Sequence, residues 1–372
     1  MTTAHSVYVH VPFCDVRCPY CHFTCFVNRD PELPDRWARA IVREWHLHRE
    51  QGRAQRVASV YFGGGTPSAL PADARERLGR WLADDVVPAC DEGAEITMEA
   101  NPESAWHESL VPWVEAGVNR ISLGVQSMDP DVLTFLGRLN TPRSNLRALE
   151  LACGLVENVS ADLIVGSPQD DRGTLVRSIE AITSFPVTHV SAYLLEIHRT
   201  TRFGRDVESG KWIPKPDDDQ ADLYLEMIER LEARGLEAYE LSNFSLPHAR
   251  AQHNARYWSR EPYLGLGPSA HSFEADRRWS NVRDTRAWCE AIEAGQPEFE
   301  VDEWLDHVAV RRERVLLGLR RREGIPVEWV AERQRWCEEA ARAGLLRREH
   351  DRWVATPRGW LLLDQLVAEL TD

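Results

Sequence analysis

The 372-residue sequence predicts an α/β fold: an open, partial barrel of six strand–helix units followed by a small helical domain. Short strand patterns alternate with amphipathic helical patterns over about the first 200 residues, which is typical of parallel βαβ units. From about residue 302 only helical patterns continue, apart from one short hairpin. Six units suit an open barrel better than a closed barrel of eight. We expect one domain over residues 1–302 and a winged-helix-like domain over 303–372.

The expected strands and helices alternate along the chain. The strands are Ser6–Val11, Val57–Phe62, Glu95–Glu99, Arg120–Val125, Ser160–Val165 and His189–Leu195. The helices between them include 34–51, 73–84, 142–157 and 174–184. Reactive groups in such barrels lie at the carboxyl ends of the strands. A cysteine loop, a glycine triplet, Glu99 and Gln126 follow the first four strands, and Asp162 within the fifth should point inward.

The last third of the sequence is less regular. Three aspartates at 217–219 begin a helix that reaches about residue 234, and 239–241 form a short strand. Residues 253–271 are rich in glycine and aromatic residues, which predicts a loop. A small β-wing is expected over 345–355, before a final helix over 358–370.

Composition and charge exclude several classes of protein. A net charge of −15, from 44 basic and 59 acidic residues, argues against a nucleic-acid partner. No apolar run approaches the ~18 residues of a membrane helix, and no apolar segment precedes Tyr8, so we expect a soluble, cytoplasmic protein. Four of the eight cysteines lie between residues 14 and 25, which in a reducing compartment indicates metal binding.

Cys14, Cys18 and Cys21 form a Cys-x3-Cys-x2-Cys loop after the first strand. Three sulfurs from one loop can hold three corners of an iron–sulfur cube and leave the fourth iron open. A structural zinc site would need a fourth ligand, for which Cys25 or His22 is available. No second Cys-x-x-Cys pair exists, so the spacing favours the cluster and leaves zinc as an alternative.

This loop, with an aromatic residue before its last cysteine, resembles the radical S-adenosylmethionine (SAM) superfamily. Its surroundings, Tyr-Val-His-Val-Pro-Phe-Cys, resemble the branch that holds oxygen-independent coproporphyrinogen III oxidases and HemW-type heme chaperones. The resemblance implies a [4Fe-4S] cluster on Cys14, Cys18 and Cys21. It also implies that the open iron binds SAM and that one electron splits SAM into methionine and a deoxyadenosyl radical. An electron donor of the flavodoxin or ferredoxin type is expected.

The resemblance also implies SAM-binding residues, although each would be unremarkable alone. SAM carries cationic groups, a carboxylate and a ribose diol, so its pocket needs acidic and amide acceptors and an arginine. The glycine motif of the superfamily matches Gly63-Gly64-Gly65-Thr66-Pro67, with Gly64, Gly65 and Thr66 as candidate contacts. The family contexts carry over to Glu99 in Met-Glu-Ala-Asn-Pro, Gln126 in Gly-Val-Gln-Ser, Arg138 in Leu-Gly-Arg and Asp162 in Ala-Asp-Leu-Ile-Val-Gly. Tyr8 and Tyr20 match positions near SAM and the cluster.

A second motif, His253-Asn254-Ala-Arg-Tyr257-Trp258, places an imidazole beside large aromatic rings. These residues suit a porphyrin, and imidazole is a common ligand of heme iron, but core packing would explain them equally well. The motif resembles the heme-binding motif of HemW-type proteins, which implies a heme-binding extension over about 240–275.

Two departures separate the chain from the oxidases. The oxidases carry a longer N-terminal arm before the first strand, whereas only thirteen residues precede Cys14 here. The oxidases also carry a further cysteine two residues after the third ligand, whereas position 23 here is Phe. His22 also departs from the Asp usual in HemW-like chains. The first hypothesis is therefore a heme chaperone that binds the cluster, SAM and heme and carries heme to an unknown acceptor protein. The alternative is an oxygen-independent coproporphyrinogen III oxidase.

Overall fold

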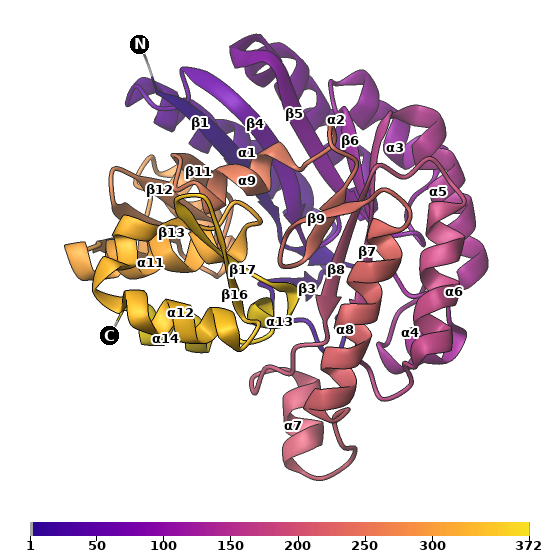
Figure 1. The fold of residues 1–372 in the computed structure, drawn as a ribbon. Helices are drawn as coiled ribbons and strands as arrows, with labels where there is room; N and C mark the ends of the chain where they lie inside the picture. The colour runs from indigo at the N-terminus through magenta and orange to yellow at the C-terminus, as the bar shows by residue number, and fades with distance from the viewer. Residues whose placement is uncertain (1–2, 372) are drawn as a thin grey trace.

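The computed structural model describes residues 3–371 and is built on one mixed sheet of 12 strands (Figure 1). Neighbouring strands from β11 to β8 run parallel, in the order β11-β1-β4-β5-β6-β7-β8. They are β11 (Tyr263–Leu266), β1 (Ala4–Val11), β4 (Arg56–Gly64), β5 (Cys90–Ala100), β6 (Arg120–Gln126), β7 (Asn158–Val165) and β8 (His189–Leu194). All six expected strands are among them, and the sheet stays open, with β14 and β9 at its edges.

Antiparallel strands extend both sides of this parallel part. They are β9 (Glu237–Glu240), β10 (Asn243–Ser245), β12 (His271–Glu274), β13 (Arg277–Asn281) and β14 (Phe299–Trp304). The predicted loop over 253–271 is therefore wrong: it contains β11, the start of β12 and most of helix α9 (Gln252–Trp258). Local propensity missed these elements because distant parts of the chain stabilise them. Tyr263 of β11 pairs with Ser6 of β1, and a carboxylate of β5 caps α9.

Helices cover the outer face of the parallel strands (Figure 1). They are α1 (Leu33–Glu50), α2 (Ala72–Trp81), α3 (His107–Glu115), α5 (Pro142–Leu155), α6 (Arg172–Thr183), α8 (Asp217–Glu232) and α10 (Thr285–Glu293). The short helices α4 (Pro130–Phe135) and α7 (Arg202–Glu208) pack together in a separate small cluster, and α7 projects from the body. In α1 the i, i+4 series Trp37, Ile41 and Trp45 is fully or almost fully buried. Trp113 of α3 is also buried, so large aromatic side chains fill the layer between helices and sheet.

The two faces of the parallel strands differ in polarity, because successive side chains of a strand point to opposite faces. Val7 and Val9 of β1, with Ile121 and Leu123 of β6, are buried in the apolar core under the helices. The alternate positions face the inside of the barrel and are polar. They include Ser6, Tyr8 and His10 of β1, Ser59 and Tyr61 of β4, Glu95 and Glu99 of β5, Arg120 and Ser122 of β6, Ser160 and Asp162 of β7, and His189 and Ser191 of β8. The sequence thus builds a polar interior.

The C-terminal part packs as helices around a small sheet. It contains α11 (His307–Arg320), α12 (Gln334–Arg342), α13 (Pro357–Trp360), α14 (Leu363–Thr371) and the sheet β15 (Ile325–Pro326), β17 (Arg352–Ala355) and β16 (Leu346–Glu349). The predicted wing is the β16–β17 hairpin, whereas the predicted final helix is divided into α13 and α14. The predicted boundary at 302/303 falls inside β14, and the division into domains stays a prediction.

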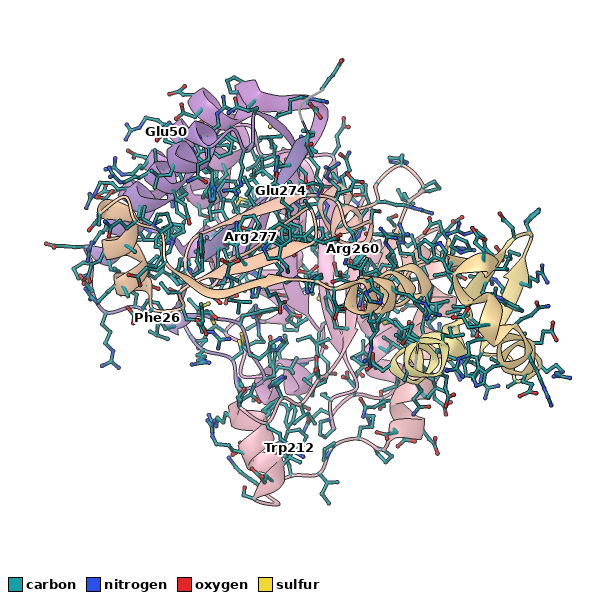
Figure 2. All side chains as sticks on the ribbon, turned by 90° about the vertical axis from the view of Figure 1, so that its left-hand side faces the viewer. Phe26, Glu50, Trp212, Arg260, Glu274 and Arg277 are labelled. Atoms are coloured by element: carbon teal, nitrogen blue, oxygen red, sulfur yellow. The ribbon has the colours of Figure 1, made fainter. Side chains whose placement is uncertain are left out.

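Figure 2 shows the antiparallel strands from the side, with Glu274 and Arg277 on them. Arg260 lies where these strands approach the C-terminal helices, and Trp212 marks the α7 segment, which projects from the body. Among the described residues, no helix is long and apolar enough to cross a membrane.

Candidate functional site

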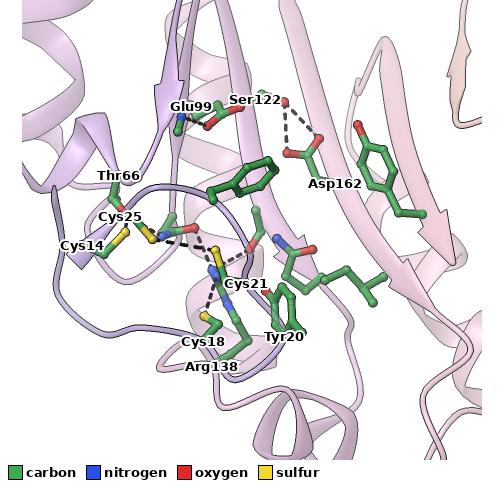
Figure 3. Close-up of a pocket in the computed structure, with 18 of the residues that line it drawn as sticks. Cys14, Cys18, Tyr20, Cys21, Cys25, Thr66, Glu99, Ser122, Arg138 and Asp162 are labelled. Carbon is green, nitrogen blue, oxygen red and sulfur yellow. Dashed lines mark hydrogen bonds between the residues drawn. The ribbon is translucent and has the colours of Figure 1, made fainter. Parts of the chain in front are cut away.

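The predicted cysteine loop starts and ends in two very short parallel strands, β2 (Phe13–Cys14) and β3 (Phe26–Val27). The Phe26 amide donates to the carbonyl of Pro12 at 2.9 Å and closes the loop. A turn inside it is held by the Cys21 amide, which donates to the carbonyl of Cys18 at 3.1 Å. The first three cysteines are only partly buried and face one cavity at the carboxyl end of the barrel (Figure 3).

This cavity has a volume of about 330 Å³. That volume is in the range of small-molecule sites in proteins. Besides the three cysteines, it is lined by Tyr20, Gly64, Gly65, Thr66, Glu99, Gln126, Arg138, Asp162 and Asn254 among the residues singled out in the sequence. Tyr8 is not in the lining. Its hydroxyl shares a 3.0 Å hydrogen bond with Nδ1 of His10, deeper in the barrel.

The glycine motif leaves no room for side chains between β1 and β4. A Cβ at Gly65 would collide with the carbonyl oxygen of Phe13, and the Gly65 amide donates to Val11 at 2.6 Å. Gly64 has φ +104°, and a Cβ there would collide with the ring of His10. Thr66 follows and donates to Sγ of Cys14 at 3.6 Å. The motif therefore holds the start of the cysteine loop against the end of β4.

Two carboxylic acids face the cavity, Glu99 from β5 and Asp162 from β7, with β6 between these strands. Glu99 accepts hydrogen bonds from the Tyr61 hydroxyl at 2.8 Å and from the Gly64 amide at 3.1 Å. Burial raises the pKa of Glu99 to about 7, although the Tyr61 hydrogen bond opposes the shift. Asp162 accepts from the Ser122 hydroxyl at 3.0 Å, and burial raises its pKa too. Both groups can accept hydrogen bonds from a polar ligand.

Arg138 connects the strand ends with the cysteine loop. Its guanidinium donates to Sγ of Cys18 at 3.7 Å and to Oδ1 of Asn101 at 2.7 Å. Gly137 before it has φ +66°, and a Cβ there would approach Cδ of Pro19 to 2.7 Å. A glycine at 137 thus lets the cysteine loop pack directly beside the arginine.

Gln126 ends β6 with a backbone conformation that is uncommon for a residue with a side chain. Its φ is +63°, and the pairing with β7 shifts register between Leu123 and Gln126. A Cβ at Gly124 would lie 2.7 Å from Oδ1 of Asn101 and 2.9 Å from Nε2 of Gln126. The irregular strand end and the missing side chain together let both amides face the cavity.

Cys25 also lines the cavity, beside the three candidate ligands. It is 6% exposed, and its Sγ is 3.8 Å from Sγ of Cys21. Hydrogen bonding with Cys25 lowers the pKa values of Cys14 and Cys21. Among the residues that the structure describes, no three His, Cys, Asp or Glu side chains converge closely enough to hold a single metal ion.

The second motif lies at the amino end of the barrel, on α9, and its residues do not converge on one cavity. His253 is 1% exposed; its Nδ1 shares a 2.9 Å hydrogen bond with Ser59 Oγ and its Nε2 a 2.7 Å bond with the Tyr257 hydroxyl. Asn254 faces the cavity from below. Trp258 points toward the C-terminal helices, where the Arg320 guanidinium lies 5.3 Å from its ring centre.

The hydrogen-bond directions at His253 follow from its partners. Ser59 donates its only hydroxyl proton to Ser6, so it accepts from Nδ1–H of His253. Nε2 then accepts the proton of Tyr257. In this arrangement neither ring nitrogen has a free lone pair for iron, so ligation of heme by His253 would require the Tyr257 hydrogen bond to break.

Three residues of the site were missed in the sequence. Tyr61 and Ser122 hold the two carboxylates, and Asn101 donates to Thr66 at 3.0 Å while it accepts from Arg138. Strand alternation places Tyr61 and Ser122 on the inward face, and Asn101 directly follows the strand of Glu99. The sequence therefore places these three residues near the site, but only the fold shows which polar residues each of them contacts.

Comparisons with known proteins agree with this architecture. Residues 8–182 match the model of the radical SAM superfamily. The chain is 38% identical over 370 residues to the heme chaperone HemW of Mycobacterium tuberculosis, covering 98% of this chain and 94% of the relative. HemW of Escherichia coli is 31% identical over 373 residues, with 97% of both chains covered.

Among solved structures, the coproporphyrinogen III oxidase HemN of Escherichia coli, a radical SAM enzyme, shares the fold. Its TM-score is 0.83 at 20% sequence identity, and the match covers 99% of this chain and 90% of HemN. This likeness concerns the fold alone, whereas the HemW relatives match in sequence along nearly the whole chain. The chain belongs to the radical SAM superfamily and, within it, to the family of the HemW heme chaperones.

Proposed function

We propose that this protein is a HemW-like heme chaperone, which binds a [4Fe-4S] cluster, SAM and heme and passes heme to an acceptor protein. The observation that supports it most is the convergence of three cysteine thiols and the matched polar residues on one cavity. Relatives with 31–38% identity that are named heme chaperones support the cargo. The acceptor protein, an electron donor of the flavodoxin or ferredoxin type and a cytoplasmic location belong to the same proposal.

The side chains around the cavity fit a cluster with one open iron. Three partly buried sulfur donors suit an iron–sulfur cluster, whereas the fourth cysteine of the loop, Cys25, is buried. Arg138 donates to Cys18 and Thr66 to Cys14, and hydrogen bonds to cluster sulfurs tune reduction potentials. We assign Cys14, Cys18 and Cys21 as ligands. When bound, the cluster supplies a single electron for cleavage of SAM.

The rest of the cavity fits SAM. Gly64 and Gly65 line the cavity with backbone atoms alone, so a ligand can approach the backbone there. Glu99 and Asp162 can accept from the cationic and hydroxyl groups of SAM, and Gln126 offers an amide. Tyr20 belongs to the same lining, whereas Tyr8 lies outside it and shares a hydrogen bond with His10.

Heme uptake tests this function. The full chain is reconstituted anaerobically with iron and sulfide and titrated with heme, while a parallel sample with SAM and a reductant is assayed for conversion of coproporphyrinogen III. We expect a new, saturable heme absorption band and no conversion. Absence of heme uptake would refute the chaperone, and protoporphyrinogen formation would identify the oxidase instead.

A further inference from the structure

Two exposed histidines stand at the rim of the cluster cavity. His22 belongs to the cysteine loop and lines the cavity, and His198 lies in the segment after β8. Their rings stack at a centroid distance of 5.3 Å with 20° between the planes. These residues are 176 positions apart, so neither the spacing of the motifs nor the strand pattern indicates the pair.

His198 is prepared as a ligand in a way that His253 is not. Its Nδ1 shares a 3.2 Å hydrogen bond with the Thr200 hydroxyl, and Nε2 has no hydrogen-bond partner among the described residues. Metal-binding histidines usually engage one ring nitrogen in this way and offer the other to the metal. At His253 both ring nitrogens are engaged and the side chain is buried.

The backbone around His198 is held in place. The amide of Thr201 donates to the His198 carbonyl at 2.9 Å, and the Thr201 hydroxyl donates to the same oxygen at 2.6 Å. The amide of Phe203, two residues further on, donates to the carbonyl of Pro19 in the cysteine loop at 2.9 Å. The segment that carries His198 is therefore attached directly to the loop that carries His22.

The rim also has the apolar surface that a porphyrin needs. Phe23, Leu139 and Tyr193 line the mouth of the cavity and are 57%, 55% and 42% exposed, which is unusual for large side chains grouped at one opening. Arg17 of the cysteine loop is exposed and near enough to Cys21 for its charge to lower the pKa of that thiol, and it can pair with a propionate. A flat, apolar, dicarboxylate ligand with an open metal site matches this surface.

We propose that heme binds across this rim, with Nε2 of His198 as the axial ligand of its iron and the ring of His22 stacked beside that ligand. The assignment rests on the proposed function, because it names the place where the cargo binds. It puts the heme at the carboxyl end of the barrel, next to the cluster loop. The α9 motif then acts as a structural support below the cavity.

The test is an anaerobic heme titration of the reconstituted full-length protein and of four variants, followed by absorption spectroscopy. His198→Ala and His22→Ala probe the rim, His253→Gln probes the motif, and His46→Ala removes an exposed histidine of α1 far from the rim. We expect His198→Ala to weaken heme binding at least about tenfold, because loss of even an outer-shell partner of a metal ligand typically costs that much. His22→Ala should have a smaller effect, and His46→Ala none.

A second measurement separates ligation from a mere packing effect. His198→Gly with added imidazole should regain the absorption spectrum of the wild-type heme complex, because free imidazole can take the place of the missing ring. Iron and sulfide content, measured on each variant, should stay at the wild-type level.

The outcomes distinguish the two proposals. If the wild-type protein takes up no heme, the chaperone function and this site both fail. If the wild-type protein binds heme and His198→Ala binds it with unchanged affinity and spectrum, the rim site is wrong and the chaperone function stands. Selective loss of heme by His253→Gln, with intact cluster content, would place the ligand on α9 instead.

Discussion

The two ends of the barrel use the same kinds of residue in opposite ways. At the amino end, Glu95 accepts from the backbone amides of Gln252 and His253 at 3.0 and 3.1 Å, and Ser59 and Tyr257 engage both nitrogens of His253. At the carboxyl end, glutamate, aspartate and cysteine side chains face a cavity of about 330 Å³. One end therefore uses its polar groups to hold the fold, and the other keeps them accessible.

Glu95 and Glu99 show the difference within one strand. Both belong to β5 and point inward, four residues apart. Glu95 caps α9, a helix of seven residues that is too short to be stable alone. Glu99 faces the cavity with help from Tyr61. Two residues of the same type thus have different roles. What differs is whether other protein groups already occupy their hydrogen-bonding atoms.

The largest effect is expected in the cysteine loop. Alanine at Cys14, Cys18 or Cys21 should reduce the iron and sulfide of the reconstituted protein to background, because a cluster held by two thiolates is not retained. Cys25→Ala is the matched control, since it removes a neighbouring thiol that is not one of the three proposed ligands. Equal loss of iron in Cys25→Ala would show that Cys25 is a ligand and contradict a cluster with an open iron.

The histidines at the two ends should differ in stability. His253→Ala leaves a cavity and removes the hydrogen-bond partner of buried Ser59, so we expect a loss of about 2–4 kcal/mol in the free energy of unfolding. His198→Ala removes an exposed side chain and should change it by less than about 0.5 kcal/mol. Urea unfolding followed by circular dichroism measures both. Equal effects would remove the distinction between a structural and an accessible histidine.

The two glutamates should separate ligand binding from folding. Glu99→Gln loses a charged hydrogen-bond partner for SAM, which should weaken SAM binding by about 1.5–3 kcal/mol, whereas Glu95→Gln should lower stability and leave SAM affinity nearly unchanged. Isothermal titration of the reconstituted variants measures the affinity. Weaker SAM binding in Glu95→Gln alone would reverse the assignment of the two ends.

The same carboxyl predicts a pH dependence. Because the pKa of Glu99 is raised to about 7, the group is mostly protonated below that pH and ionised above it. SAM affinity should therefore rise as the pH increases through 7 and level off above it. In Glu99→Gln the rise should be much smaller. A wild-type affinity that falls over this range would contradict the contact between Glu99 and a cationic group of SAM.

Tyr61→Phe should have a smaller effect on SAM binding than Glu99→Gln. It removes one hydrogen bond to Glu99 and leaves the ring in place, so the free energy of SAM binding should weaken by about 1 kcal/mol. Since this bond lowers the pKa of Glu99, its loss should move the midpoint of the pH dependence upward. A midpoint that moves downward would show that another group controls the titration.

Much of the carboxyl end could be predicted from the sequence, because its signals are local. The cysteine loop, the glycine triplet and Glu99 all lie at or just after the ends of strands that alternation alone predicts. The positive φ of Gln126 and the contact between Gly137 and Pro19 could not be predicted, since they depend on how distant loops meet.

The amino end was harder to predict for the same reason. The sequence of α9 predicts a loop because seven residues are too few to show a helical periodicity. The helix is stabilised instead by Glu95, more than 150 residues earlier in the chain. The stacking of His22 on His198 is equally non-local. Local sequence patterns therefore indicate which elements carry polar side chains, but not which of these side chains lack a hydrogen-bond partner in the folded protein.

The position of α9 has one more consequence. Asn254 of this helix faces the cavity, and a ligand of the proposed cluster would have to pass the rim that carries His22 and His198 if it entered from the loop side. A heme bound at that rim would block this entrance. SAM would therefore have to bind before heme, and its cleavage products could leave only after heme has been transferred. Each turnover of SAM would then be coupled to the delivery of one heme.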